Sequence, residues 1–122
     1  MAPTALIVDD DAGFRRVAGR LLAARGFVVV AQAEDGARGL AAARLHHPHC
    51  VLLDVHLPDG PWLPIARAML SGSAPVPRIL VTSTEPSAVA EAEVVAAGVV
   101  GFVAKDRLVG ADLVALFGLP TP

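Results

Sequence analysis

Cysteine, tyrosine and lysine are scarce in this chain of 122 residues, which contains one cysteine, one lysine and no tyrosine. The lone Cys50 excludes an intramolecular disulfide, and the apolar residues after it suggest a buried core side chain rather than a reactive thiol. No uncharged apolar stretch is long enough to span a membrane, and the short apolar N-terminus does not form a signal peptide. These absences predict a cytoplasmic protein that makes no membrane contact.

Basic charge is also limited, since the net charge is -2 and the isoelectric point is about 6.0. This balance gives no positive field for gripping nucleic acid, so any DNA contact would need another segment. The hydrophobic content of 54% is enough to fill one core. We expect one domain over residues 1–117, followed by a tail or the start of a linker at 118–122.

Five apolar runs of strand length alternate with segments of helical periodicity. The runs are nearly continuous rather than alternating, which is typical of strands covered on both faces. The pattern therefore predicts the α/β class, with an open five-stranded parallel sheet and helices on both faces. The expected strands are 6–8, 27–30, 50–53, 79–81 and 99–103, and the expected helices are 11–25, 34–46, 61–70, 86–97 and 106–117.

Polar residues follow four of these runs at their carboxyl ends, where ligands bind in open α/β sheets. They are Asp9, Asp10, Asp54, Thr82, Ser83 and Lys105. Three carboxylates that converge repel one another, so they need a cation with a preference for oxygen ligands, such as Mg²⁺ or Mn²⁺. A carboxylate beside such an ion can accept a phosphoryl group, and the lysine can neutralise the transferring oxygens.

Four segments carry a resemblance to a known family: LIVDD at 6–10, LLDVHLPDG at 52–60, ILVTS at 79–83 and GFVAK at 101–105. In this order and spacing they resemble the receiver domains of bacterial response regulators. The resemblance covers nearly the whole chain and implies a flavodoxin-like sheet with strand order 2-1-3-4-5.

The resemblance also implies a role for each site residue. Asp10, Asp54 and the backbone carbonyl of His56 would bind Mg²⁺ directly, and Asp9 would act through a water molecule. Asp54 would accept the phosphoryl group, and Lys105 would pair with it. Thr82 and Phe102 would form the switch, and Ser83 and Thr84 would border the site.

The implied function is that of a signalling switch rather than a classical enzyme, although such a domain promotes its own phosphorylation and dephosphorylation. A sensor histidine kinase would donate the phosphoryl group. The resulting change would act on a surface formed by the fourth helix, fifth strand and fifth helix, through which a homodimer could form to control an output such as transcription. DNA would be contacted only through an output domain absent from this chain.

Some features depart from the common pattern. Lys105-Asp106 replaces the frequent Lys-Pro pair, so no cis peptide bond is expected there, and this variant resembles regulators with a helix-turn-helix output. Pro61 and Pro64 predict a short or irregular third helix. His56 and Thr84 lie where they could guide or block water.

Each of these features also has a simpler interpretation. The run 9–11 could only cap the first helix, with Asp11 as the cap, Asp54 could be a turn residue, and Lys105 a solvated lysine. Thr82 could be a plain strand residue and Phe102 a core residue. The histidines at 46–49 lack the spacing of known zinc sites and are interpreted as a solvated loop.

Other functions are also conceivable. A degenerate receiver could act as a phosphorylation-independent docking module, but the acidic pair, Asp54, Thr82 and Lys105 are all present. An aspartate-nucleophile phosphatase would need an acid two residues after the nucleophile, where this chain has His56. A flavin-binding domain would need a hydroxyl-rich loop after the first strand, where the aspartates would repel phosphate.

Overall fold

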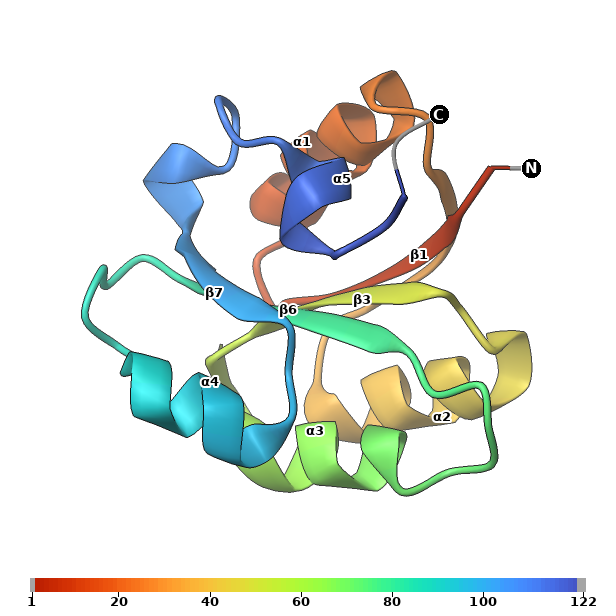
Figure 1. The fold of residues 1–122 in the computed structure, drawn as a ribbon, viewed down its shortest axis with the longest axis vertical. Coiled ribbons are helices and arrows are strands. Elements are labelled where there is room, and N and C mark those ends of the chain that lie inside the picture. Colours follow the sequence, from red (N-terminus) through yellow and green to blue (C-terminus); the bar gives the residue numbers. More distant parts are fainter. Residues whose placement is uncertain (1, 121–122) are drawn as a thin grey trace.

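A computed structural model describes residues 2–120 and contains one parallel sheet of five strands (Figure 1). The sheet order is β2-β1-β3-β6-β7, which is the predicted order 2-1-3-4-5 when only the strands of this sheet are numbered. Every residue of the central strand β3 is buried, which explains why its sequence is a continuous apolar run. The strands are β1 (Thr4–Val8), β2 (Val28–Ala33), β3 (Cys50–Asp54), β6 (Arg78–Ser83) and β7 (Gly101–Ala104).

Helices cover both faces of the sheet, as predicted. In Figure 1, α1 (Ala12–Ala24) and α5 (Leu113–Leu116) lie above it, and α2 (Gly36–His46), α3 (Trp62–Leu70) and α4 (Glu91–Ala97) lie below it. Successive residues of β1 enter opposite cores: Ile7 packs with α1 and α5, whereas Leu6 and Val8 pack with α2 and α3.

The helix α1 forms for the reasons visible in its sequence. Asp11 caps it, because its carboxylate accepts hydrogen bonds from the backbone N–H groups of Gly13 at 2.9 Å and Phe14 at 3.2 Å. Ala18 and Leu22 are buried against the sheet. Gly26 follows the helix with a φ of 90°, a conformation that favours glycine.

The third helix is regular and nine residues long, so its two prolines do not disturb it. Pro61 occupies the N-cap and Pro64 lies in the first turn, where a backbone N–H has no acceptor within the helix. A two-residue ladder precedes the helix, since β4 (His56–Leu57) pairs antiparallel with β5 (Gly60–Pro61). We call residues 55–61 the site hairpin.

The C-terminal helices are shorter than predicted, and here the sequence pattern was misleading. The fourth helix starts at Glu91 rather than at 86. At this start the Glu93 carboxylate accepts a hydrogen bond from the backbone N–H of Ala90 at 2.9 Å. The fifth is divided into a 3₁₀ turn, Lys105–Arg107, and the single turn α5, which Asp112 caps. The Arg25 guanidinium donates to the carbonyls of Val109 and Ala111, which holds the intervening loop.

At the other end of the sheet, two reciprocal hydrogen bonds join the start of β1 to the residue before β3, and we call this pair the Thr4–His49 clasp. The His49 Nδ1 accepts from the backbone N–H of Thr4 at 2.9 Å, and the Thr4 hydroxyl accepts from the backbone N–H of His49 at 3.0 Å. His49 therefore has a structural role at this end of the sheet. Cys50 is fully buried, which raises the pKa of its thiol to about 11 and makes it unreactive.

Ala74–Pro75 is the cis peptide bond found within residues 2–120, so Lys105–Asp106 is trans. None of the helices in the described chain is long and apolar enough to cross a membrane. The predicted tail begins at Gly118, where Leu119 still packs on the core. Residues 121 and 122 of that tail lie outside the described residues.

Candidate functional site

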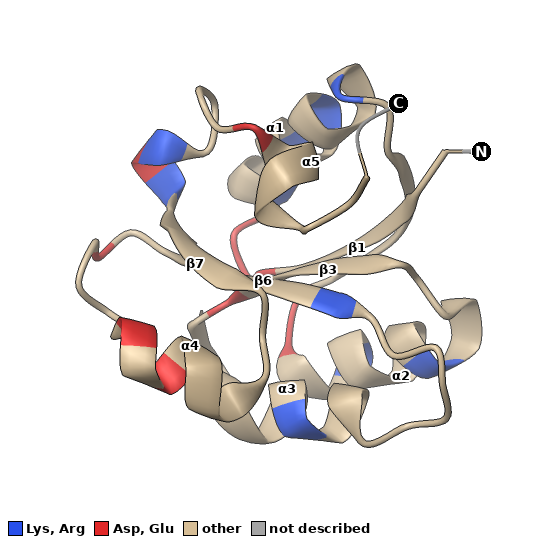
Figure 2. Ribbon diagram, viewed as in Figure 1, with Lys and Arg blue, Asp and Glu red and all other residues tan. Residues whose placement is uncertain are grey.

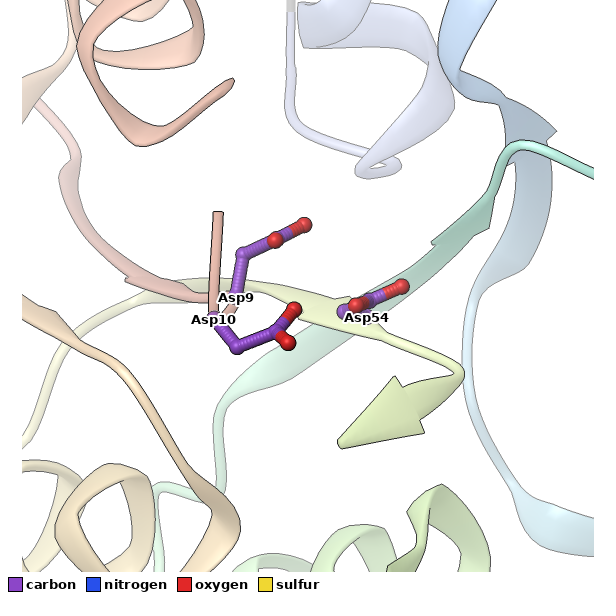
Figure 3. Close-up of side chains that lie close together, drawn as sticks. All are labelled: Asp9, Asp10 and Asp54. Carbon is purple, nitrogen blue, oxygen red and sulfur yellow. The ribbon is translucent and has the colours of Figure 1, made fainter. Parts of the chain in front are cut away.

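Three aspartates from two neighbouring strands meet at the carboxyl end of the sheet, as predicted (Figure 3). Asp9 and Asp10 follow β1, and Asp54 is the last residue of β3. Each offers a carboxylate oxygen, and these oxygens lie within 4.8 Å of one another. Asp9 and Asp54 are buried, with exposures of 0% and 4%, whereas Asp10 is exposed.

The ammonium group of Lys105 faces two of these carboxylates. Lys105 is the first residue of the turn that follows β7. Its Nζ lies 2.7 Å from Asp9 Oδ2 and 3.8 Å from Asp54 Oδ1. Figure 2 shows acidic residues where β1 and β3 end and basic residues on this turn. A single ammonium group cannot balance three carboxylates, so the cluster retains negative charge.

The pKa of the Asp54 carboxyl group is raised. Burial is the main cause, and the nearby charge of Asp9 adds to it, whereas Lys105 and the backbone N–H of His56 act in the opposite direction. The same charges favour a divalent cation. Asp9 Oδ2 is buried and, apart from its ion pair with Lys105, has no hydrogen-bond partner among residues 2–120. The donor set therefore fits a hard cation.

Thr82 lies directly beside Asp54, because the two residues are register partners between β3 and β6. Its side chain is buried, and within residues 2–120 its hydroxyl has no hydrogen-bond partner. A buried hydroxyl without a partner is costly, which makes it a marker of a site that binds another group. Ser83 is also buried, but its hydroxyl accepts from the backbone N–H of Glu85 at 3.1 Å.

The remaining predicted residues surround this centre at different depths. His56 and Thr84 are exposed. A hollow of about 490 Å³ lies beside the cluster, bounded by Asp10, Trp62 and the site hairpin, including His56. Phe102 is half-buried in β7 and packs against the lower core, on the side of α2, α3 and α4.

Three contacts around the site were not predicted. The Phe14 ring centroid lies 4.3 Å from Lys105 Nζ, a cation–π contact from α1. Arg15 donates to the backbone carbonyl of Asp9 at 2.6 Å. Asp59 in the site hairpin accepts hydrogen bonds from the N-terminus of α2. The sequence signals for the Phe14 and Asp59 contacts are weak, because each meets a segment distant along the chain, whereas Arg15 lies only six residues from Asp9.

The fold and site together define a class: a doubly wound α/β domain with a buried aspartate cluster and a lysine at the carboxyl end of its sheet. The family model of the response regulator receiver domain matches residues 5–114. The chain therefore belongs to the response regulator receiver domain family of two-component systems. Receiver domains of this family interact with histidine kinases and typically bind Mg²⁺ at an acidic pocket.

Known proteins agree with this assignment. The chain is 31% identical over 100 residues to the transcription regulator BvgA of Bordetella pertussis, covering 82% of this chain and 47% of BvgA. Among solved structures, the receiver domain of NarL from Mycobacterium tuberculosis has 30% identity and a TM-score of 0.78, covering 96% and 98% of the two chains.

A LuxR-family response regulator from Aurantimonas has 26% identity and a TM-score of 0.82, covering 98% of this chain and 88% of that one. The chain spans less than half of the length of each of the first curated relatives that it matches, with shares from 24% to 49%.

Proposed function

We propose that Asp54 is the phosphoacceptor of a switch that receives its phosphoryl group from a sensor histidine kinase. One observation supports this most strongly. The Asp54 carboxylate lies together with two further carboxylates, the Lys105 ammonium group and the buried hydroxyl of Thr82, which has no hydrogen-bond partner within residues 2–120. In this role the domain would promote its own phosphorylation and dephosphorylation rather than act as a classical enzyme.

Asp10, Asp54 and the backbone carbonyl of His56 would hold a Mg²⁺ or Mn²⁺ ion, and Asp9 would contribute through a water molecule. Two features support this division of roles. Asp10 is exposed, whereas Asp9 Oδ1 already accepts from the backbone N–H of Asp11 at 2.9 Å and Oδ2 meets Lys105. When bound, the ion would neutralise negative charge on the oxygens of the phosphoryl group.

The residues of the chain account for the remaining chemistry. A carboxylate oxygen of Asp54 forms a bond to phosphorus, while the bond from phosphorus to the donor breaks and the donor leaves with its electron pair. Lys105 then pairs with an oxygen of the phosphoryl group. The Thr82 hydroxyl donates a hydrogen bond to another oxygen of the phosphoryl group. Ser83, Thr84 and His56 border the site, where they influence access of the hydrolytic water.

The switch would pass from Thr82 to Phe102 and from there to the surface formed by α4, β7 and the segment after Lys105. This surface is where a homodimer or output partner would bind. Because α5 is a single turn, the 3₁₀ turn and the loop held by Arg25 replace most of the predicted fifth helix in it. DNA would be contacted through an output domain outside this chain, in a cytoplasmic regulator whose receiver spans residues 1–117.

Mass spectrometry tests the proposal directly. Intact protein is incubated with Mg²⁺ and acetyl phosphate, with Asp54→Asn and a sample in EDTA as controls. We expect a gain of one phosphoryl group in the native protein and none in either control. Asp10→Asn should strongly reduce the gain as well.

A folded protein that gains no phosphoryl group and does not bind beryllofluoride would contradict the proposal. That outcome would favour a phosphorylation-independent docking module instead. A gain that persists in Asp54→Asn would place the acceptor at another residue.

A further inference from the structure

The Asp59 carboxylate connects two segments that flank the acidic cluster. Its Oδ1 accepts from the backbone N–H of Gly36 at 2.8 Å, and its Oδ2 accepts from the backbone N–H of Ala37 at 3.0 Å. Gly36 and Ala37 form the first turn of α2, where backbone N–H groups lack acceptors within the helix. Asp59 thus caps a helix that begins 23 residues earlier in the chain.

This helix already has a cap of its own. Asp35, the N-cap residue, accepts from the backbone N–H of Arg38 at 2.7 Å. Asp35 satisfies the third N–H group of the helix, and Asp59 satisfies the two before it. The two carboxylates therefore accept hydrogen bonds from different N–H groups of the same helix terminus. Of the two, Asp59 is the one that joins the helix to another segment.

The site hairpin that carries Asp59 also carries the proposed metal ligand His56. In its ladder His56 pairs with Pro61 and Leu57 pairs with Gly60, so Asp59 lies in the turn between the two short strands. Two paired residues on each side hold a hairpin weakly in water. The two hydrogen bonds from the start of α2 to Asp59 join the turn of this hairpin to the helix.

Close packing at the same place supports a fixed arrangement. A Cβ atom at Gly36 would lie 2.8 Å from Ile65 Cγ1 and 3.2 Å from Asp59 Oδ1. Glycine at 36 therefore lets α3 and the hairpin approach the start of α2. The hydrogen bonds to Gly36 and Ala37 also lower the pKa of Asp59, so its carboxylate is charged where it meets the positive end of the helix.

We infer that Asp59 is a positioning residue for the metal site, holding the site hairpin against α2 so that the His56 carbonyl stays in place for Mg²⁺. This inference rests on the proposed function. Residues behind metal ligands commonly change metal affinity by roughly tenfold or more when they are replaced. Asp59 acts in this way without touching the ion.

The test is a Mg²⁺ titration of the full chain that follows the fluorescence of Trp62, the single tryptophan, which lines the same hollow as Asp10 and His56. Calorimetry provides a second measurement. Asp59→Ala should raise the dissociation constant for Mg²⁺ roughly tenfold. Asp59→Asn should have an intermediate effect, because its amide oxygen still accepts one hydrogen bond.

Asp35→Ala is the matched control, because it removes a cap from the same helix but leaves the hydrogen bonds between the helix and the site hairpin in place. We expect both alanine variants to lower the melting temperature, but only Asp59→Ala to weaken Mg²⁺ binding by more than about twofold. Equal effects on Mg²⁺ binding would overturn the inference, as would native affinity in Asp59→Ala. If the native protein itself binds no Mg²⁺, the proposed function fails together with the inference. If the native protein binds Mg²⁺ and Asp59→Ala binds it equally well, only the inference about Asp59 fails.

Discussion

The two ends of the sheet differ in how their polar groups are paired. At the amino ends of the strands, Thr4 and His49 satisfy each other with neutral hydrogen bonds. At the carboxyl ends, Asp9 and Asp54 are buried with only Lys105 to balance them, and the Thr82 hydroxyl has no partner among residues 2–120. One end stabilises the fold, whereas the other holds unbalanced charge.

This difference shows where the domain trades stability for function. Buried carboxylates without sufficient counter-charge destabilise the folded state, and a bound cation relieves that cost. The stability of the aspartate cluster should therefore respond strongly to Mg²⁺, and the Thr4–His49 clasp should not respond at all. The following substitutions test the contrast.

The largest effect is expected for Lys105→Met. Removing the ammonium group leaves two buried carboxylates without a cation, which should lower the free energy of unfolding by about 3 kcal/mol in EDTA. Urea denaturation at pH 7 measures it. Arg107→Met is the control, because Arg107 is exposed in the same 3₁₀ turn, and its effect should stay below about 0.5 kcal/mol. Equal losses in both variants would refute the role of Lys105 as the balancing charge.

A smaller effect of opposite sign is expected for Asp54→Asn. Because burial and Asp9 raise the pKa of Asp54 in the folded protein, folding favours its protonated form. That contribution is present below the unfolded pKa and is lost as the pH rises through the folded pKa. At pH 7 in EDTA the neutral amide should therefore stabilise the protein, by on the order of 1–2 kcal/mol.

Thermal unfolding from pH 4 to pH 8 checks this prediction. The advantage of Asp54→Asn should grow as the pH rises and should shrink when Mg²⁺ is added, because the ion stabilises only the native protein. A variant that is less stable than the native protein at every pH would contradict the account of Asp54 as a strained charge.

The smallest effect is expected at the opposite end of the sheet. Thr4→Val keeps the shape of the side chain but removes the hydroxyl that accepts from His49, and should cost about 1 kcal/mol. The same loss should be measured by urea denaturation with and without Mg²⁺, and phosphorylation should be unchanged. A loss that depends on Mg²⁺ would show that the two ends are coupled.

Much of the fold could be predicted from the sequence because burial leaves a direct pattern. Continuous apolar runs marked all five strands of the sheet, and the cap of α1 was visible at Asp11. The C-terminal helix could not be predicted correctly. Its periodicity extended over residues 106–117, but Asp112 starts a new helix and Arg25 holds the loop before it.

The site divides in the same way. Asp9, Asp10, Asp54, Thr82 and Lys105 were predictable because parallel strands bring their carboxyl ends to one edge. Phe14 and Asp59 were not, since each meets a partner whose position depends on how helices pack on the sheet.

The sequence by itself determined the class of fold, the family and the set of charged groups at one edge of the sheet, because strand periodicity and residue order are local properties. The tertiary structure decided which charges are buried, that Lys105 pairs more closely with Asp9 than with Asp54, and that Asp59 ties the site hairpin to α2. Those outcomes depend on distances between segments far apart in the chain, which the packing of helices on the sheet sets.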